Sequence, residues 1–155
     1  MMVEPELEPA TLAVVRKMLL GALALGVAGT GAELILLGHV ESAAQWVPVI
    51  GCGLAVPLLA WHAKRASRAT VTAIRVLMAA FIVSGAIGVG LHYDGNAEFE
   101  RERNPRGNGW PFIRSILTGA TPVLAPGSMV LLGLIGFAQV YRHPSATRGA
   151  GRDHA

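Results

Sequence analysis

The chain has 155 residues, of which 52% are hydrophobic and only 15% carry a charge, against about 25% charged residues in an ordinary soluble domain. Four long apolar runs in so short a chain would leave too little polar surface to cover a water-soluble fold, so the composition excludes that class and indicates one membrane domain. The net charge of +3 requires no nucleic-acid partner, because basic residues that flank the apolar runs account for it.

The first apolar run covers residues 18–39 and follows an acidic leader, residues 1–10, which we expect to be a flexible tail. A signal peptide would begin with a basic segment and end at a cleavage site of small residues, and neither is present. We therefore expect this run to be the first membrane span. At about 1.5 Å per residue, its length crosses a hydrocarbon core of about 30 Å.

One acidic residue, Glu33, lies inside the first run, six residues before its outer end at His39. A carboxylate at such a depth costs about 2.5 kcal/mol or more on insertion scales, so it should face protein or water. Two interpretations stay open. Glu33 is either a proton- or cation-binding residue, or a protonated side chain that holds helices in register through a hydrogen bond to Ser84, Thr30 or a backbone carbonyl.

The second and third runs cover residues 43–61 and 71–93. Only a short turn separates the first two runs, so we expect them to form neighbouring antiparallel helices. The third run carries a stripe of small residues at four-residue steps, which lets another helix come close and predicts that His92 faces the bundle interior. The stripe consists of Ala80, Ser84 and Gly88.

Histidines and acidic residues gather where the first and third runs end on the same side of the predicted bundle. His39 and His92 should lie at about the same depth, and Asp94 and Glu98 follow closely in the sequence. Imidazoles and carboxylates together suit a divalent transition metal, whereas two histidines on facing helices can alternatively hold a haem. The sequence therefore predicts a metal or haem site here. The competing interpretation is an ordinary membrane boundary, where such residues are common.

The remaining chain contains one long connection and the last run. We expect residues 94–119 to form an outer loop that ends in a short interfacial helix after Pro111. The fourth run, residues 120–141, should begin irregularly because it contains Pro122 and Pro126. Residues 143–155 are expected to be a second flexible tail.

Lys and Arg are divided unequally between the two sides of the predicted bundle, with nine on one side and four on the other. The richer side should face the cytoplasm, so both termini are expected there, in a bacterial-type inner membrane. The predicted architecture is an all-α integral membrane protein, a four-span antiparallel bundle with a short interfacial helix before the fourth span.

Three functions remain open at this point. The sequence contains no nucleotide-binding loop, zinc-protease motif, cysteine pair or nucleophile elbow, so it favours a non-enzymatic accessory or scaffold subunit of a homo-oligomer or larger membrane complex. The second function is that of a metal- or haem-binding membrane protein that uses His39 and His92. The third is that of a small ion or proton transporter with Glu33 in the membrane.

Overall fold

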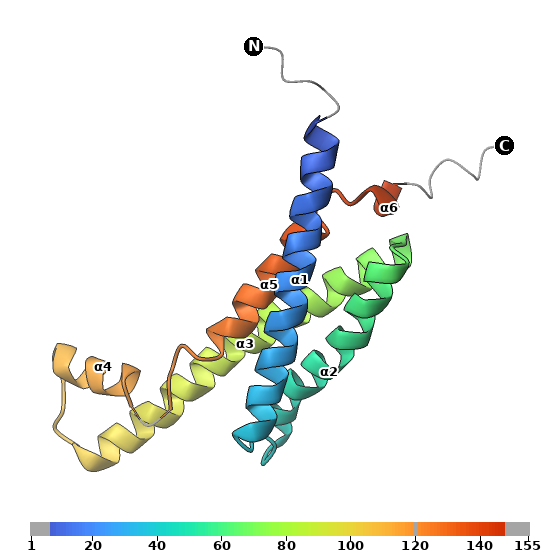
Figure 1. Ribbon diagram of the computed structural model, residues 1–155. Helices are drawn as coiled ribbons and strands as arrows, with labels where there is room; N and C mark the ends of the chain where they lie inside the picture. Colours follow the sequence, from blue (N-terminus) through green and yellow to red (C-terminus); the bar gives the residue numbers. More distant parts are fainter. Residues whose placement is uncertain (1–6, 120, 148–155) are drawn as a thin grey trace, which may run out of the picture.

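The computed structural model describes residues 7–119 and 121–147, and every regular element in this part of the chain is a helix. The helices in chain order are α1 (Leu7–Leu36), α2 (Ala43–Lys64), α3 (Arg68–Arg103), α4 (Gly109–Leu117), α5 (Gly127–Gln139) and α6 (Pro144–Thr147). Helices α1, α2, α3 and α5 form one bundle, and α3 continues beyond it and carries α4 at its far end (Figure 1). Three helices, α1, α2 and α3, are long and apolar enough to cross a membrane, which supports the predicted membrane class.

The connection between α1 and α2 is tightly specified by local hydrogen bonds. Gly38 adopts a φ of 65°, a left-handed conformation that favours glycine after a helix end. The N–H groups of Gly38 and His39 donate to the carbonyls of Ile35 and Leu34, which is the Schellman pattern. A capping box then starts α2 at Ser42. Helix α1 consequently ends three residues earlier than the predicted span.

Helix α3 is longer than predicted, with 36 residues and a length of about 54 Å. Its first turn is stabilised by a second capping box, at Ser67. Residues 94–103, which we predicted to be loop, continue the helix, because the turn-forming segment begins only at Asn104. An ion pair between Glu100 and Arg103, with 2.9 Å between nitrogen and oxygen, joins neighbouring turns of this extension.

The fourth apolar run forms a shorter helix than predicted, since α5 has 13 residues and a length of about 20 Å. Residues 121–126, hereafter the lead-in segment, are not helical because Pro122 and Pro126 lack the N–H donor and restrict the residue before each of them. The short helix predicted before the fourth run is present as α4. Of the predicted tails, residues 7–10 belong to α1 and residues 144–147 form α6, while residues 1–6 and 148–155 lie outside the described residues.

Helices α3 and α5 run antiparallel and approach each other backbone to backbone at glycines. A Cβ atom added at Gly133 would lie 2.8 Å from the carbonyl oxygen of Met78, and one added at Gly85 would lie 2.8 Å from the carbonyl oxygen of Pro126. Gly88, from the predicted stripe, also lies against Pro126. The other two residues of the stripe contribute less, because Ala80 is exposed and Ser84 is only half-buried.

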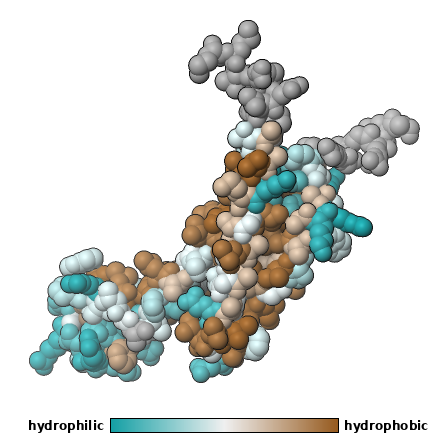
Figure 2. Space-filling view, viewed as in Figure 1, coloured by the Kyte–Doolittle hydropathy of each residue, from teal (hydrophilic) through white to brown (hydrophobic). Residues whose placement is uncertain are grey.

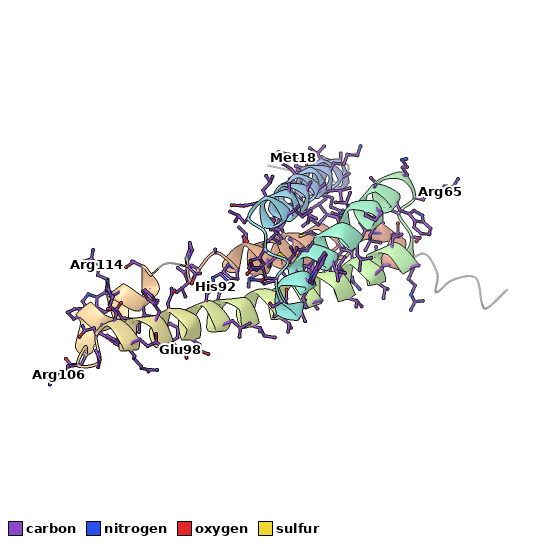
Figure 3. The ribbon with its side chains drawn as sticks, turned by 90° about the horizontal axis from the view of Figure 1, so that it is seen from below. Met18, Arg65, His92, Glu98, Arg106 and Arg114 are labelled. Carbon is purple, nitrogen blue, oxygen red and sulfur yellow. The ribbon has the colours of Figure 1, made fainter. Side chains whose placement is uncertain are left out.

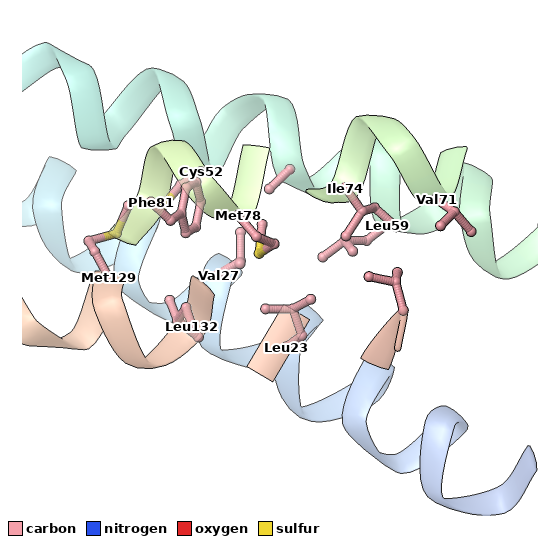
Figure 4. Close-up of a cluster of buried hydrophobic side chains, with 12 residues drawn as sticks. Leu23, Val27, Cys52, Leu59, Val71, Ile74, Met78, Phe81, Met129 and Leu132 are labelled. Atoms are coloured by element: carbon pink, nitrogen blue, oxygen red, sulfur yellow. The ribbon is translucent and has the colours of Figure 1, made fainter. Parts of the chain in front are cut away.

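Apolar side chains from all four bundle helices meet in one core (Figure 4). Its buried members include Leu23, Val27, Cys52, Leu59, Met78, Phe81, Met129 and Leu132. Many large apolar side chains also cover the outside of the bundle, and Leu36 is 86% exposed. Figure 2 shows this apolar covering and a hydrophilic lobe at the end formed by α4 and the last turns of α3. Such an apolar surface suits contact with lipid rather than water.

Candidate functional sites at the two ends of the bundle

The structure brings His39 and His92 together, as their predicted depth implies. His39 lies in the turn after α1, where the Schellman hydrogen bonds fix its backbone, and His92 lies on α3. The two ring centroids are 6.4 Å apart, and the ring planes are inclined by 56°. Both side chains are half-buried. Two imidazoles from separate elements therefore lie side by side at the end of the bundle where α1 ends.

The imidazole of His92 is oriented by the lead-in segment. Its Nδ1 atom lies 3.1 Å from the carbonyl oxygen of Pro122, and a carbonyl can only accept a hydrogen bond. The Nδ1 atom therefore carries a proton, and in this tautomer the lone pair lies on Nε2. The same carbonyl oxygen also accepts a hydrogen bond from the N–H of Ala125 at 3.1 Å, so His92 is joined to a turn of the lead-in segment.

Asp94 and Glu98 lie away from the two histidines. On α3 they are turned by about 200° and 240° from His92, at 100° per residue, and Figure 3 shows Glu98 on the side of the helix opposite to His92. Both acids line an open depression of about 540 Å³ whose walls all belong to α3. Among the residues that the structure describes, no three His, Cys, Asp or Glu side chains are placed to hold a metal ion. The predicted four-residue site is thus reduced to its two imidazoles.

Glu33 lies on the exposed side of α1, three residues or about 4.5 Å from the end of the helix. It is closer to the end of its helix than the sequence suggests, because α1 ends at Leu36 and not at His39. The expected hydrogen bond to Ser84 is absent, since the Ser84 hydroxyl donates to the carbonyl of Phe81. The carboxyl group makes no hydrogen bond or ion pair with any residue in the ranges 7–119 and 121–147.

A polar cluster that sequence reasoning missed lies at the opposite end of the bundle. His62 is only 3% exposed, and its Nδ1 atom lies 2.9 Å from the hydroxyl oxygen of Thr70. The Nε2 atom of Gln139 lies 3.3 Å from His62 Nε2 and donates to it. The cluster thus joins α2, α3 and α5 through one imidazole. A glutamine at the end of the fourth apolar run is the signal in the sequence that points to it.

Two arginine side chains donate hydrogen bonds to carbonyl groups of the turn that follows α5. Arg16 donates to the carbonyls of Tyr141 and Arg142, and Arg75 donates to the carbonyl of Val140. The His143 ring lies 5.1 Å from that of His62. Burial, and then the nearby Arg16 guanidinium, lower the pKa of His143 below its ordinary value of 6.5. These contacts fasten the chain after α5 to α1 and α3.

No protein-family model matches the sequence, and no curated protein or solved structure is significantly similar to it. The membrane class therefore rests on the length and apolar character of α1, α2 and α3.

Proposed function

We propose that the chain is a small non-enzymatic membrane protein that acts as a scaffold or accessory subunit and associates through one face of α1. The observation that carries this proposal is the unpaired carboxyl group of Glu33 on the exposed side of an apolar helix. Ionisable groups in membrane segments almost always face protein or water and are paired. A second surface that covers Glu33 would meet this requirement.

The residues around Glu33 form a surface that another helix can approach closely. The exposed α1 face consists of Ala22, Leu25, Gly29, Ala32, Glu33 and Leu36. A Cβ atom added at Gly29 would meet nothing within 4 Å, so packing inside the chain does not require a glycine there. Small residues on an exposed face allow helix backbones to approach each other in a membrane.

The occupant that fits this face is a second copy of the chain. Two copies with the same orientation in one bilayer carry Glu33 at the same depth, so their carboxyl groups can share a proton and satisfy each other. A two-fold contact also places the same small residues of both copies against each other. The exposed α1 face is therefore complementary to itself in both shape and hydrogen bonding.

We further propose a bacterial-type inner membrane, four spans and both termini in the cytoplasm. The basic residues at the α5 end of the bundle support this orientation. The lead-in segment and α5 support the fourth span, because they run along α3 from His92, which contacts Pro122, to Arg75, which contacts Val140. The location of α4 in the outer interface is supported by three large apolar side chains that are exposed on it, Trp110, Ile113 and Leu117.

Self-association is tested by energy transfer between labelled copies of the full chain in lipid vesicles. We expect Gly29→Leu to weaken the dimer by about tenfold or more, roughly 1.4 kcal/mol. Gly53→Leu on α2 is the matched control, because this exposed glycine also has nothing within 4 Å. Glu33→Gln should keep the dimer, whereas Glu33→Leu should weaken it. A wild-type chain that remains monomeric at every protein-to-lipid ratio would contradict the proposal.

The transport function remains a prediction of the sequence. If the chain is a transporter, liposomes that contain the wild type should show a proton or cation flux, and Glu33→Gln should abolish this flux. Because Glu33→Gln preserves the proposed dimer contact, this variant separates transport from self-association.

A further inference from the structure

We propose that His39 and His92 together bind one divalent transition-metal ion, such as Zn²⁺, Co²⁺, Ni²⁺ or Cu²⁺, at the end of the bundle where α1 ends. Imidazole nitrogen is a good ligand for these ions. The site goes beyond the proposed scaffold role and does not depend on it, because neither histidine belongs to the exposed α1 face. It also differs from the site that the sequence predicts, since Asp94 and Glu98 take no part.

The two rings lie close enough for a small rotation to bring both onto one ion. Their centroids are 6.4 Å apart, and a four-coordinate ion at about 2.0–2.1 Å from a nitrogen of each ring needs a distance of roughly 5 Å. His39 is supported by the turn after α1 and His92 by α3. Both supports are regular hydrogen-bonded structure, so the separation does not depend on a loose loop.

His92 makes a hydrogen bond that is typical of metal-binding histidines. Histidines that bind metals usually donate their second ring N–H to a carbonyl or carboxylate, which fixes the tautomer and the ring orientation. His92 makes this hydrogen bond from Nδ1 to the carbonyl of Pro122. Its Nε2 lone pair has no hydrogen-bond donor within the described ranges, and the same holds for both ring nitrogens of His39.

The other histidine pair differs in the use of its lone pairs. The rings of His62 and His143 are closer, at 5.1 Å, but each ring already accepts a hydrogen bond on one nitrogen. His62 contacts Thr70 and Gln139, and Nδ1 of His143 accepts a hydrogen bond from the N–H of Ser145. Of the two histidine pairs in the described part of the chain, the pair of His39 and His92 has lone pairs free for an ion.

The coordination of the ion would be completed from outside the pair. Two imidazoles occupy two positions, and a four-coordinate ion keeps the others for water or for a group from another molecule. Because both histidines are half-buried, solvent reaches the site.

The test is a titration of the detergent-purified full chain with Co²⁺, followed by its visible absorption and by competition with Zn²⁺. All samples carry His154→Ala and a purification tag without histidine, so the tail does not contribute ligands. We expect one ion per chain, and at least about tenfold weaker binding for His39→Ala and for His92→Ala. His143→Ala is the control and should leave binding unchanged, as should Glu98→Ala.

The two histidine variants test the site in different ways, because His92 also contacts the lead-in segment and His39 does not. If His92 only supports the lead-in segment, then His92→Ala lowers stability while His39→Ala binds Co²⁺ like the wild type, and the proposal is wrong. It is also wrong if the wild type binds no more Co²⁺ than the double variant, or if the purified protein shows a haem absorption band that needs both histidines. His39→Ala, on an exposed turn, tests the site even if His92→Ala fails to fold.

Discussion

The Asn96 side chain joins α3 by hydrogen bonds to the end of α4 and to the start of the lead-in segment. Asn96 is 5% exposed, and its Nδ2 atom donates to the carbonyls of Ile116 and Thr121 at 2.9 and 2.7 Å. Its Oδ1 atom accepts a 2.7 Å hydrogen bond from the hydroxyl of Thr121. The prolines of the run predict an interruption, but the sequence does not reveal which distant side chains repair it, because that depends on the register between α3 and α5.

Replacement of Asn96 by alanine should loosen α4 and the lead-in segment. Loss of a hydrogen bond at a largely buried carbonyl costs about 1–3 kcal/mol, so hydrogen exchange at residues 116–119 and at Thr121 should become faster. Asn108→Ala is the matched control, because Asn108 precedes α4 without a side-chain capping bond. Equal exchange rates in Asn96→Ala and wild type would show that these hydrogen bonds do not hold the segment.

His143 makes the contact between α6 and the bundle dependent on pH. Its folded-state pKa is lowered from 6.5 by burial and by Arg16, so the folded state favours the neutral ring. The neutral His143 ring therefore stabilises the folded state above about pH 6.5. This stabilisation is lost as the pH falls through the lower folded-state pKa of the ring.

A magnetic-resonance titration of the His143 ring measures this effect. We expect a midpoint below about 6.5, and greater mobility of residues 143–147 once the ring is protonated. Arg16→Gln should move the midpoint upward, because it removes the neighbouring positive charge. A midpoint at or above the ordinary value for histidine would contradict the described environment.

At the scale of helices, apolar length predicts which segments are helical but not where they end. Local capping decides the ends, as the Schellman turn at Gly38 does for α1 and the capping box at Ser67 does for α3. The extension of α3 also explains why the predicted acidic ligands do not reach the histidines. A loop after Tyr93 could fold back toward His39, whereas a continuing helix turns Asp94 to the opposite side.

The contact between α3 and α5 should fail when a glycine in it is replaced by a larger residue. Gly133→Val places new atoms against the backbone of Met78, and we expect a loss of about 1–3 kcal/mol. Gly53→Val on the exposed side of α2 should change stability little, since nothing lies within 4 Å of that position. Reversible unfolding in mixed detergent micelles measures both variants. Equal stability of the two would indicate that α5 packs differently.

At the scale of the whole molecule, the large exposed apolar surface of the bundle follows from the sequence. The similar depth of His39 and His92 also follows, because the first and third apolar runs have the same direction, although α3 continues past His92. The polar cluster around His62 and the bond from His92 to Pro122 do not follow, since each depends on how helices distant in sequence are rotated toward each other.

The proposed orientation predicts which turns can be labelled from outside an intact bacterial cell. In a Cys52→Ala background, Glu41→Cys should react with a membrane-impermeant maleimide, and Ala66→Cys should react only after the cells are opened. Both positions are exposed in the structure, so access depends on the side of the membrane. The reverse labelling pattern would place the termini outside.

The central claim is that a lipid bilayer surrounds α1, α2 and α3, and alkaline extraction of membranes from expressing cells tests it most directly. A chain that spans the bilayer should stay in the pellet after a carbonate wash and ultracentrifugation, and only detergent should release it. Helical, folded protein in the detergent-free supernatant would contradict the account, because the apolar surface of the bundle would then have to be stable in water.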